Sequence, residues 1–281
     1  RQQGDEQVGF RRVLAHVAEG CGKQDDWELL QVSMRSNTTA TTAVTFDDAV
    51  HLSPTNSKAD AWNWERLNLL GSPVARINAD HTIRSFTTTS ADRFRGLQAE
   101  IFLAVGARVF VNNNIWTSAG LANGAVGVVV HMHWPEGRTP PSFSDVVFVR
   151  MENYSGPQYF EDTSVDIAGQ ALDLTNVIPI APLEVATRGL GDQPPARCVR
   201  IQLPLAVAFA ITTHKSQGQS LLRAVVDIGS SEQTDGQTFT ALSRIQTMEG
   251  LLLEDIDLDR VLRIGQGNAF QLRLGAIQRI R

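Results

Sequence analysis

A β-rich stretch in the middle of the chain lies between two stretches in which helical and strand-like segments alternate. Turn signals such as Asn123-Gly124 and Pro140-Pro141 separate its short β-like segments. Strands are expected at residues 105–111, 126–132, 146–149, 177–185 and 198–203. Because several short strands with turn signals favour a small barrel, the sequence predicts a β subdomain inserted into an α/β domain.

The two flanking stretches carry the α/β pattern. Before the β-rich stretch the sequence predicts helices at 8–20 and 25–30, a loop at 33–45, a strand at 49–52, and a helix from Asn56 or Ser57 to about Leu69. After it, the sequence predicts a buried helix at 205–213, a core strand at 225–228, a helix at 237–244 and an edge strand at 251–253. The strand–turn–helix unit at 49–69 is what α/β domains are built from.

Composition restricts the class of protein. The chain has 281 residues, 42% hydrophobic and 20% charged, which is typical of a soluble globular protein with a core. A formal net charge of −5 excludes a strongly basic surface, so any nucleic-acid binding needs a local groove. Cys21 and Cys198 are the two cysteines and lie far apart in the sequence, which predicts a reducing compartment without a disulfide framework, and no apolar run approaches the ~20 residues that span a bilayer. The chain begins at Arg1 and not at Met, so we expect a fragment or a processed product.

Two polar segments suggest phosphate chemistry. Thr213-His214-Lys215-Ser216-Gln217-Gly218 carries lysine and hydroxyl groups that can contact phosphates, and a glycine that permits close backbone approach. Arg244 closes a short apolar helix, where a guanidinium can stabilise charge on a transferring phosphoryl group. The alternatives are a solvated polar loop and an arginine that complements the helix dipole. In an α/β sheet, both Gly218 and Arg244 are expected to reach the carboxyl-edge crevice where ligands bind.

Several stretches resemble one family, the petite-integration-frequency (Pif) helicases, which are RecD-like motors of superfamily one. The similar stretches are 203–218, 240–244 with Gly250-Leu251, 105–109 with 120–127, 52–56, and the opening Arg1-Gln2. They cover nearly the whole chain and occur in the expected order. The resemblance implies an α/β, RecA-like second motor domain of the P-loop NTPase type, formed by residues 1–107 and 201–281. It also implies an inserted SH3-like β subdomain at 108–200.

The resemblance further implies roles for individual residues. Arg244 would be the finger on the γ-phosphate of ATP and Arg1 a second phosphate arginine, while Gln217, Gly218 and Ser220 would face the nucleotide. Thr213, His214 and Lys215 would follow the phosphates of single-stranded DNA, and Thr55 and Asn56 would do so from another loop. Trp116 and Trp134 are candidates for base stacking, although surface or core packing is the alternative for either.

The chain also departs from the family pattern. It contains no GxxxxGK[ST] phosphate loop, and Gly20-Cys21-Gly22-Lys23-Gln24 is interpreted as a helix-ending turn. The lysine and the Mg²⁺ ligands would therefore belong to an N-terminal motor domain that this sequence lacks, and the chain alone is predicted not to hydrolyse ATP. His131 and His133 share a strand face and are interpreted as exposed residues, so no metal site is predicted here.

The resemblance thus predicts the C-terminal motor region of an ATP-dependent 5′→3′ DNA helicase. The expected partners are single-stranded DNA, ATP with Mg²⁺, and the N-terminal motor domain, and the protein is expected to be monomeric and without membrane contact. An intracellular location, nuclear or mitochondrial, and roles in DNA repair, recombination and telomere maintenance are implied. The alternatives are a non-enzymatic module that binds single-stranded nucleic acid as a relic of a helicase, and a protein-interaction domain.

Overall fold

The chain folds into two compact units, which a computed structural model describes for residues 7–162, 164–167, 170–187, 198–230 and 232–266. The terminal unit combines Arg1–Asn63 with Phe209–Arg281, and the central unit is Trp64–Ala208. Residues 64–107 and 201–208, which the sequence assigned to the discontinuous motor domain, lie in the central unit. The central unit is therefore larger than the predicted insertion at 108–200.

A parallel sheet forms the core of the terminal unit. Its strand order is β14-β1-β15-β16, and each neighbouring pair is parallel. All four strands are buried along their length, as expected for a parallel sheet that is covered on both faces. The predicted core strand at 225–228 and edge strand at 251–253 are confirmed. The strands are β1 (Val50–Ser53), β14 (Ala210–Thr212), β15 (Ala224–Val226) and β16 (Leu251–Leu253).

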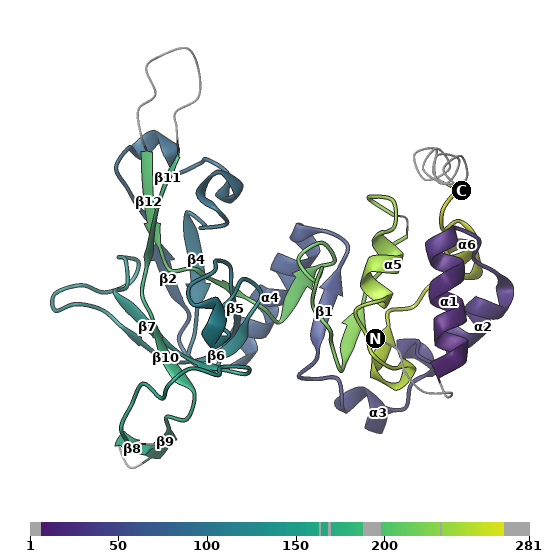
Figure 1. The fold of residues 1–281 in the computed structure, drawn as a ribbon, viewed down its shortest axis with the longest axis horizontal. Coiled ribbons are helices and arrows are strands. Elements are labelled where there is room, and N and C mark those ends of the chain that lie inside the picture. Colours follow the sequence, from purple (N-terminus) through teal and green to yellow (C-terminus); the bar gives the residue numbers. More distant parts are fainter. Residues whose placement is uncertain (1–6, 163, 168–169, 188–197, 231, 267–281) are drawn as a thin grey trace. The chain divides into compact units, whose positions relative to one another are not determined.

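Helices cover this sheet. In Figure 1, α4 and α5 lie on opposite sides of β1, and α5 lies between the sheet and α1, which also contacts α2. The apolar residues of α1 are buried, and the helix ends at Gly20 in the left-handed conformation, φ 66°, as the sequence predicted. The helices are α1 (Val8–Glu19), α2 (Gln24–Gln31), α3 (Ala40–Val44), α4 (Asn56–Leu69), α5 (Gln237–Leu242) and α6 (Leu258–Leu262). Among the described residues, no helix has the length and apolar character needed to cross a bilayer.

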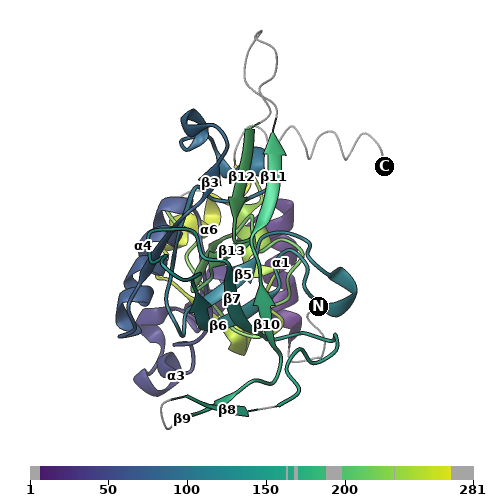
Figure 2. The same cartoon turned by 90° about the vertical axis from the view of Figure 1, so that its left-hand side faces the viewer.

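The central unit consists mostly of antiparallel sheet. Its largest sheet has the order β10-β7-β6-β5-β13, a second has the order β11-β12-β3, and β2-β4 and β8-β9 form two-stranded pairs. Figure 2 shows β11 and β12 side by side, in agreement with their register. The strands are β2 (Ala75–Asn78), β3 (Asp80–His81), β4 (Glu100–Leu103), β5 (Arg108–Val111), β6 (Val126–His133), β7 (Val146–Met151), β8 (Ser164–Ile167), β9 (Gln170–Asp173), β10 (Val177–Ile180), β11 (Leu183–Thr187), β12 (Cys198–Gln202) and β13 (Leu205–Val207).

A buried arginine organises one end of the central unit. The Arg200 side chain on β12 is fully buried and lies over the ring of Phe94, 4.0 Å from its centroid. Its guanidinium donates to the carbonyls of Leu97 (2.7 Å), Phe86 (3.0 Å) and Thr89 (2.9 Å). One side chain therefore satisfies three backbone acceptors of the segment 86–97 that has little regular structure of its own.

Three secondary-structure predictions are wrong. The expected helix at 205–213 is two short strands, because the chain leaves the antiparallel sheet after β13 and enters the parallel sheet at β14. The expected strand at 177–185 is also two strands, β10 and β11, which pair in different sheets on either side of Ala181-Pro182. The expected loop at 33–45 contains a 3-10 turn at Arg35–Asn37 and the helix α3, whose first turn is capped by the Thr39 hydroxyl.

Candidate functional site

The carboxyl ends of the four parallel strands meet at one edge of the sheet, here called the carboxyl edge. The Thr213 backbone N–H donates to the Ser53 carbonyl (3.0 Å), and the Asp227 N–H donates to the Leu52 carbonyl (2.9 Å). These bonds place the loops that follow β1, β14 and β15 next to one another. The loop containing Thr55 and the loop beginning at Thr213 therefore lie together, where open α/β sheets bind ligands.

The loop after β14 divides into buried and exposed residues. Thr213 is buried, and its hydroxyl also donates to the Ser53 carbonyl (3.3 Å), so both of its hydrogen-bond donors are used within the fold. His214 and Lys215 are exposed, and the His214 Nε2 lies 3.1 Å from the Thr234 hydroxyl. Among these three residues, His214 and Lys215 present their side chains to solvent, whereas Thr213 joins their loop to β1.

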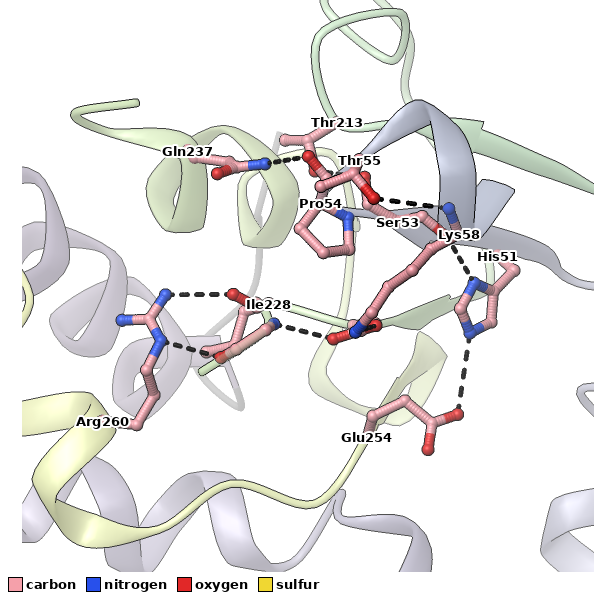
Figure 3. Close-up of polar contacts among 12 residues, drawn as sticks. His51, Ser53, Pro54, Thr55, Lys58, Thr213, Ile228, Gln237, Glu254 and Arg260 are labelled. Atoms are coloured by element: carbon pink, nitrogen blue, oxygen red, sulfur yellow. Dashed lines mark hydrogen bonds and ion pairs between the residues drawn. The ribbon is translucent and has the colours of Figure 1, made fainter. Parts of the chain in front are cut away.

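The loop after β1 caps a helix. The Thr55 hydroxyl oxygen accepts the N–H of Lys58 (3.3 Å), which leaves the hydroxyl hydrogen able to donate, and Asn56 is exposed. The side-chain amide of Gln237, at the start of α5, donates to the Pro54 carbonyl (2.8 Å; Figure 3). The amide oxygen of Gln237 accepts the Gln233 N–H (2.9 Å). The buried Gln237 thus fixes the loop that carries Thr55.

Ion pairs surround this edge. The Lys58 ammonium lies 2.7 Å from the Asp227 carboxylate. Glu254, directly after β16, pairs with Arg35 (3.0 Å) and lies 3.7 Å from the buried ring of His51. The interaction with His51, together with that with Arg35, lowers the pKa of Glu254 to about 2. The carboxylate of Glu254 is therefore ionised throughout the physiological range.

Arg260 on α6 supports the same edge from below the loop after β15. It is buried, and its guanidinium donates to the carbonyls of Ile228 (3.2 Å; Figure 3) and Gly229 (3.0 Å) and to the Thr238 hydroxyl (2.8 Å). Burial lowers the pKa of Arg260 below the ordinary value of an arginine. This arginine joins the end of β15 to the start of α5.

Arg244 lies at the opposite edge of the sheet, here called the amino edge. Leu221, which precedes β15, donates its N–H to the Arg244 carbonyl (2.9 Å) and accepts the N–H of Gln246 (3.2 Å). The prediction that Arg244 reaches the carboxyl edge is therefore wrong, because α5 runs back along the sheet from the end of β15. The structure does bring the two predicted nucleotide segments together.

The predicted nucleotide residues differ in their surroundings. Gln217, Gly218 and Ser220 are exposed, and Gly218 adopts φ 86°, which favours glycine. The half-buried Arg244 guanidinium donates to the Thr240 carbonyl (2.9 Å) and to the Ser243 hydroxyl (2.8 Å) of its own helix. Arg1 lies outside the described residues.

No group of three or more His, Cys, Asp or Glu side chains in the described part of the chain is arranged to hold a metal ion. His131 and His133 are both exposed on β6, and the His133 Nδ1 lies 2.8 Å from the Asp145 carboxylate.

The two tryptophans considered for base stacking differ in exposure. Trp116 is 46% exposed beside Tyr154, whereas the Trp134 indole N–H donates to the Ser142 carbonyl (3.1 Å). Trp116 is thus the more accessible surface for stacking.

The sequence did not single out Lys58, Asp227, Gln237, Glu254 or Arg260. Each acts through a contact with a residue far away in the chain, such as Gln237 with Pro54 and Arg260 with Ile228. The signal that was available is positional. Glu254 is the first residue after the predicted strand at 251–253, and Asp227 directly follows the apolar residues Ala224–Val226 of β15, at the edge where ligand-contacting side chains gather.

Comparison with known sequences identifies relatives. No family model matches the chain. The ATP-dependent DNA helicase PIF7 of Trypanosoma brucei brucei is 30% identical over 217 residues, 73% of this chain and 20% of that protein. The mouse ATP-dependent DNA helicase PIF1 is 34% identical over 155 residues, 55% of this chain and 19% of that protein. The chain therefore spans about a fifth of the length of these curated relatives.

Solved structures show the same fold. The Pif1 helicase of Candida albicans matches with a TM-score of 0.67 at 20% identity, over 100% of this chain and 59% of that one. A Bacteroides Pif1 helicase, solved in complex with ADP-AlF3 and single-stranded DNA, matches with a TM-score of 0.63 at 20% identity, over 99% of this chain and 55% of that one. The mixed α/β architecture is thus a RecA-like helicase fold. By sequence relatives and by structural neighbours, the chain is a homologue of the Pif1 DNA helicases that spans part of their length.

Proposed function

We propose that this chain is the C-terminal motor region of an ATP-dependent DNA helicase, which moves 5′→3′ on single-stranded DNA and unwinds duplex. In this proposal the terminal unit grips the strand at its carboxyl edge and senses ATP at its amino edge. The phosphates of the strand are contacted by Thr55 and Asn56 from one loop and by His214 and Lys215 from another. Thr213 holds the second of these loops in place. The other wall of the nucleotide site belongs to a motor domain outside this sequence.

One observation carries the proposal. The segment 213–223 connects the carboxyl end of β14 to the amino end of β15. Because the two strands are parallel to each other, this segment must run from one edge of the sheet to the other. His214 and Lys215 lie at its start, Gly218 lies in its middle, and Ser220 directly precedes Leu221, which is bonded to Arg244. A single segment therefore joins the proposed DNA contacts to the proposed nucleotide contacts.

At the amino edge, Arg244 is the residue proposed to stabilise charge on the γ-phosphate, and Arg1 is proposed as a second phosphate arginine. Gln217 and the Gly218 backbone are proposed to face the nucleotide, with Ser220 beside them. Mg²⁺ would neutralise the charge of the phosphates, and we propose that residues of the other motor domain hold it. The chain by itself is therefore proposed not to hydrolyse ATP.

The remaining assignments belong to the same proposal. The antiparallel sheet of the central unit is proposed to contain an SH3-like barrel at 108–200, inserted into a motor domain of 1–107 and 201–281. The parent protein is proposed to be a monomeric intracellular helicase, nuclear or mitochondrial, with roles in DNA repair, recombination and telomere maintenance. The alternative is a non-enzymatic relic that binds single-stranded nucleic acid.

The test uses the full-length parent protein. Arg244→Ala should reduce ATP turnover by roughly 10³-fold or more, while the affinity for single-stranded DNA changes little, because an arginine finger acts on the phosphoryl group in the transition state. Arg263→Ala is the matched control, since Arg263 is an exposed arginine on the terminal unit that bonds only to its own helix, at the Asp259 carbonyl. Unchanged turnover in Arg244→Ala would remove this residue from the mechanism. A parent gene without any phosphate-loop motif would favour the relic.

A further inference from the structure

Lys58 is held at the carboxyl edge by a single ion pair. It lies in the first turn of α4, its side chain is 55% exposed, and its ammonium contacts one carboxylate oxygen of Asp227 at 2.7 Å. Figure 3 shows the side chain extending from α4 toward the end of β15, beside Ile228. The lysines of this chain are Lys23, Lys58 and Lys215. Lys215 lies in one loop that the proposed function assigns to DNA, and Lys58 lies in the helical turn that directly follows the other.

Asp227, in contrast, is fixed by the fold. Its N–H donates to the Leu52 carbonyl of β1 (2.9 Å), and its second carboxylate oxygen accepts the N–H of Gly229 (2.7 Å). The carboxylate therefore cannot turn away when a ligand arrives. Lys58 can, because a lysine has four rotatable side-chain bonds and this one is more than half exposed.

The ion pair is weak enough to exchange. A pair of this kind near the surface contributes about 0–1 kcal/mol, because water screens the charges and a long side chain must be ordered. A phosphate that approaches Thr55 meets two opposite charges on neighbouring residues. The Lys58 ammonium attracts it, and the fixed carboxylate of Asp227 repels it.

We propose that Lys58 is a further contact for the backbone phosphate of single-stranded nucleic acid, and that Asp227 restrains it until the strand binds. The inference rests on the proposed function of the carboxyl edge. When a phosphate enters, the ammonium leaves the Asp227 carboxylate and donates to a phosphate oxygen. Asp227 then lowers the affinity for the strand, because its carboxylate repels the phosphate and competes with it for the Lys58 ammonium.

The two partners should have opposite effects on binding. Removing the lysine removes an attraction, whereas neutralising the aspartate removes a repulsion and frees the lysine. Asp227→Asn keeps an oxygen that accepts the Gly229 N–H, so the loop after β15 should keep its conformation. A pair with only a structural role would instead give two variants that lose thermal stability and change affinity in the same direction.

The experiment measures the anisotropy of a fluorescein-labelled oligothymidylate bound to this 281-residue chain, between about 50 and 200 mM salt. Lys58→Gln should weaken binding about two- to fivefold and reduce the slope of log K against log salt by about 0.7, which is one phosphate contact. Asp227→Asn should strengthen binding about two- to fivefold. Lys23→Gln, an exposed lysine at the start of α2, is the control for general charge loss and should change binding less than Lys58→Gln.

A further variant tests the role of Lys58 separately from the proposal that the carboxyl edge binds DNA. If Lys215→Gln weakens binding but Lys58→Gln changes neither the affinity nor the slope, the assignment of Lys58 is wrong and the carboxyl edge still binds the strand. If neither lysine matters, or if the wild-type chain does not bind, the carboxyl edge is not the DNA site and both proposals are overturned. Thermal unfolding of each variant identifies any loss of affinity that comes from unfolding, and in that case Lys58→Met replaces Lys58→Gln.

Discussion

The side chain of Gln237, at the start of α5, donates a hydrogen bond to the carbonyl of Pro54, in the loop that follows the central strand β1. The other end of α5 leads directly into Arg244, whose Nε donates back to the Thr240 carbonyl of the helix. One short helix therefore contacts the loop proposed to grip DNA and carries the arginine proposed to sense ATP.

The first prediction concerns this hydrogen bond. Gln237→Leu leaves the Pro54 carbonyl without its buried partner, which should cost about 1–3 kcal/mol of stability. In the full-length parent, it should reduce the stimulation of ATP turnover by single-stranded DNA while the turnover without DNA is largely retained. The measurement compares the two turnover rates. Gln233→Ala is the control, because it keeps the backbone N–H that bonds to the side chain of Gln237. If Gln237→Leu reduces the turnover with and without DNA equally, Gln237 does not couple DNA binding to ATP turnover.

A second prediction concerns acid stability. The folded-state pKa of Glu254 is about 2, below its ordinary value of 4.5. A carboxyl whose pKa is lowered on folding contributes stability that is fully present above its unfolded pKa and is lost as the pH falls through its folded pKa. Glu254→Gln should therefore lower stability by about 1–2 kcal/mol at pH 7 and flatten the loss between about pH 4.5 and pH 2.

Denaturant unfolding at several pH values, followed by a probe in the terminal unit, gives this measurement. Arg35→Gln should reproduce part of the effect, because Arg35 is the second partner of Glu254. A Glu254→Gln profile parallel to that of the wild type down to about pH 2 would show that Glu254 does not titrate in this window.

A third prediction concerns Arg200. Arg200→Met leaves the carbonyls of Leu97, Phe86 and Thr89 without their shared donor, and it should destabilise the central unit by about 3–5 kcal/mol. Hydrogen exchange should become faster along 86–97. Arg76→Met is the matched control. Arg76 pairs with Glu100 on the surface of the same unit, where such pairs contribute about 0–1 kcal/mol. Similar exchange in both variants would show that Arg200 does not hold this segment.

The strand–turn–helix unit at 49–69 and the alternation at 224–253 could be predicted because each pattern is local. Apolar runs of three residues form β15 and β16, the short strand β1 precedes a turn and a helix, and the helices have their own spacing. The segment 205–213 could not be predicted in the same way. Its unbroken apolar run conceals the passage between Ala208 and Phe209 from one unit to the other. Only tertiary pairing distinguishes its two strands from a buried helix.

The candidate site divides along similar lines. Thr55 and Asn56 could be found because they follow a predicted strand, whereas His214 and Lys215 follow a segment that was predicted as a helix and were found through their polar motif. Their placement at one edge follows from the parallel pairing of β1 with β14. The position of Arg244 at the other edge depends on the direction of α5 relative to β15, and the sequence analysis placed it wrongly. The supporting residues Gln237 and Arg260 depend on contacts across the fold, which no local pattern encodes.

The course of segment 213–223 has a mechanical consequence. Because β14 and β15 point the same way, these residues have to traverse the sheet from one rim to the other, and they form no helix or strand as they do so. The segment is fixed at one end by the bonds of Thr213 to Ser53 and at the other by the bond of Leu221 to Arg244. We therefore expect a ligand that moves either end to act on the other through the backbone that joins them.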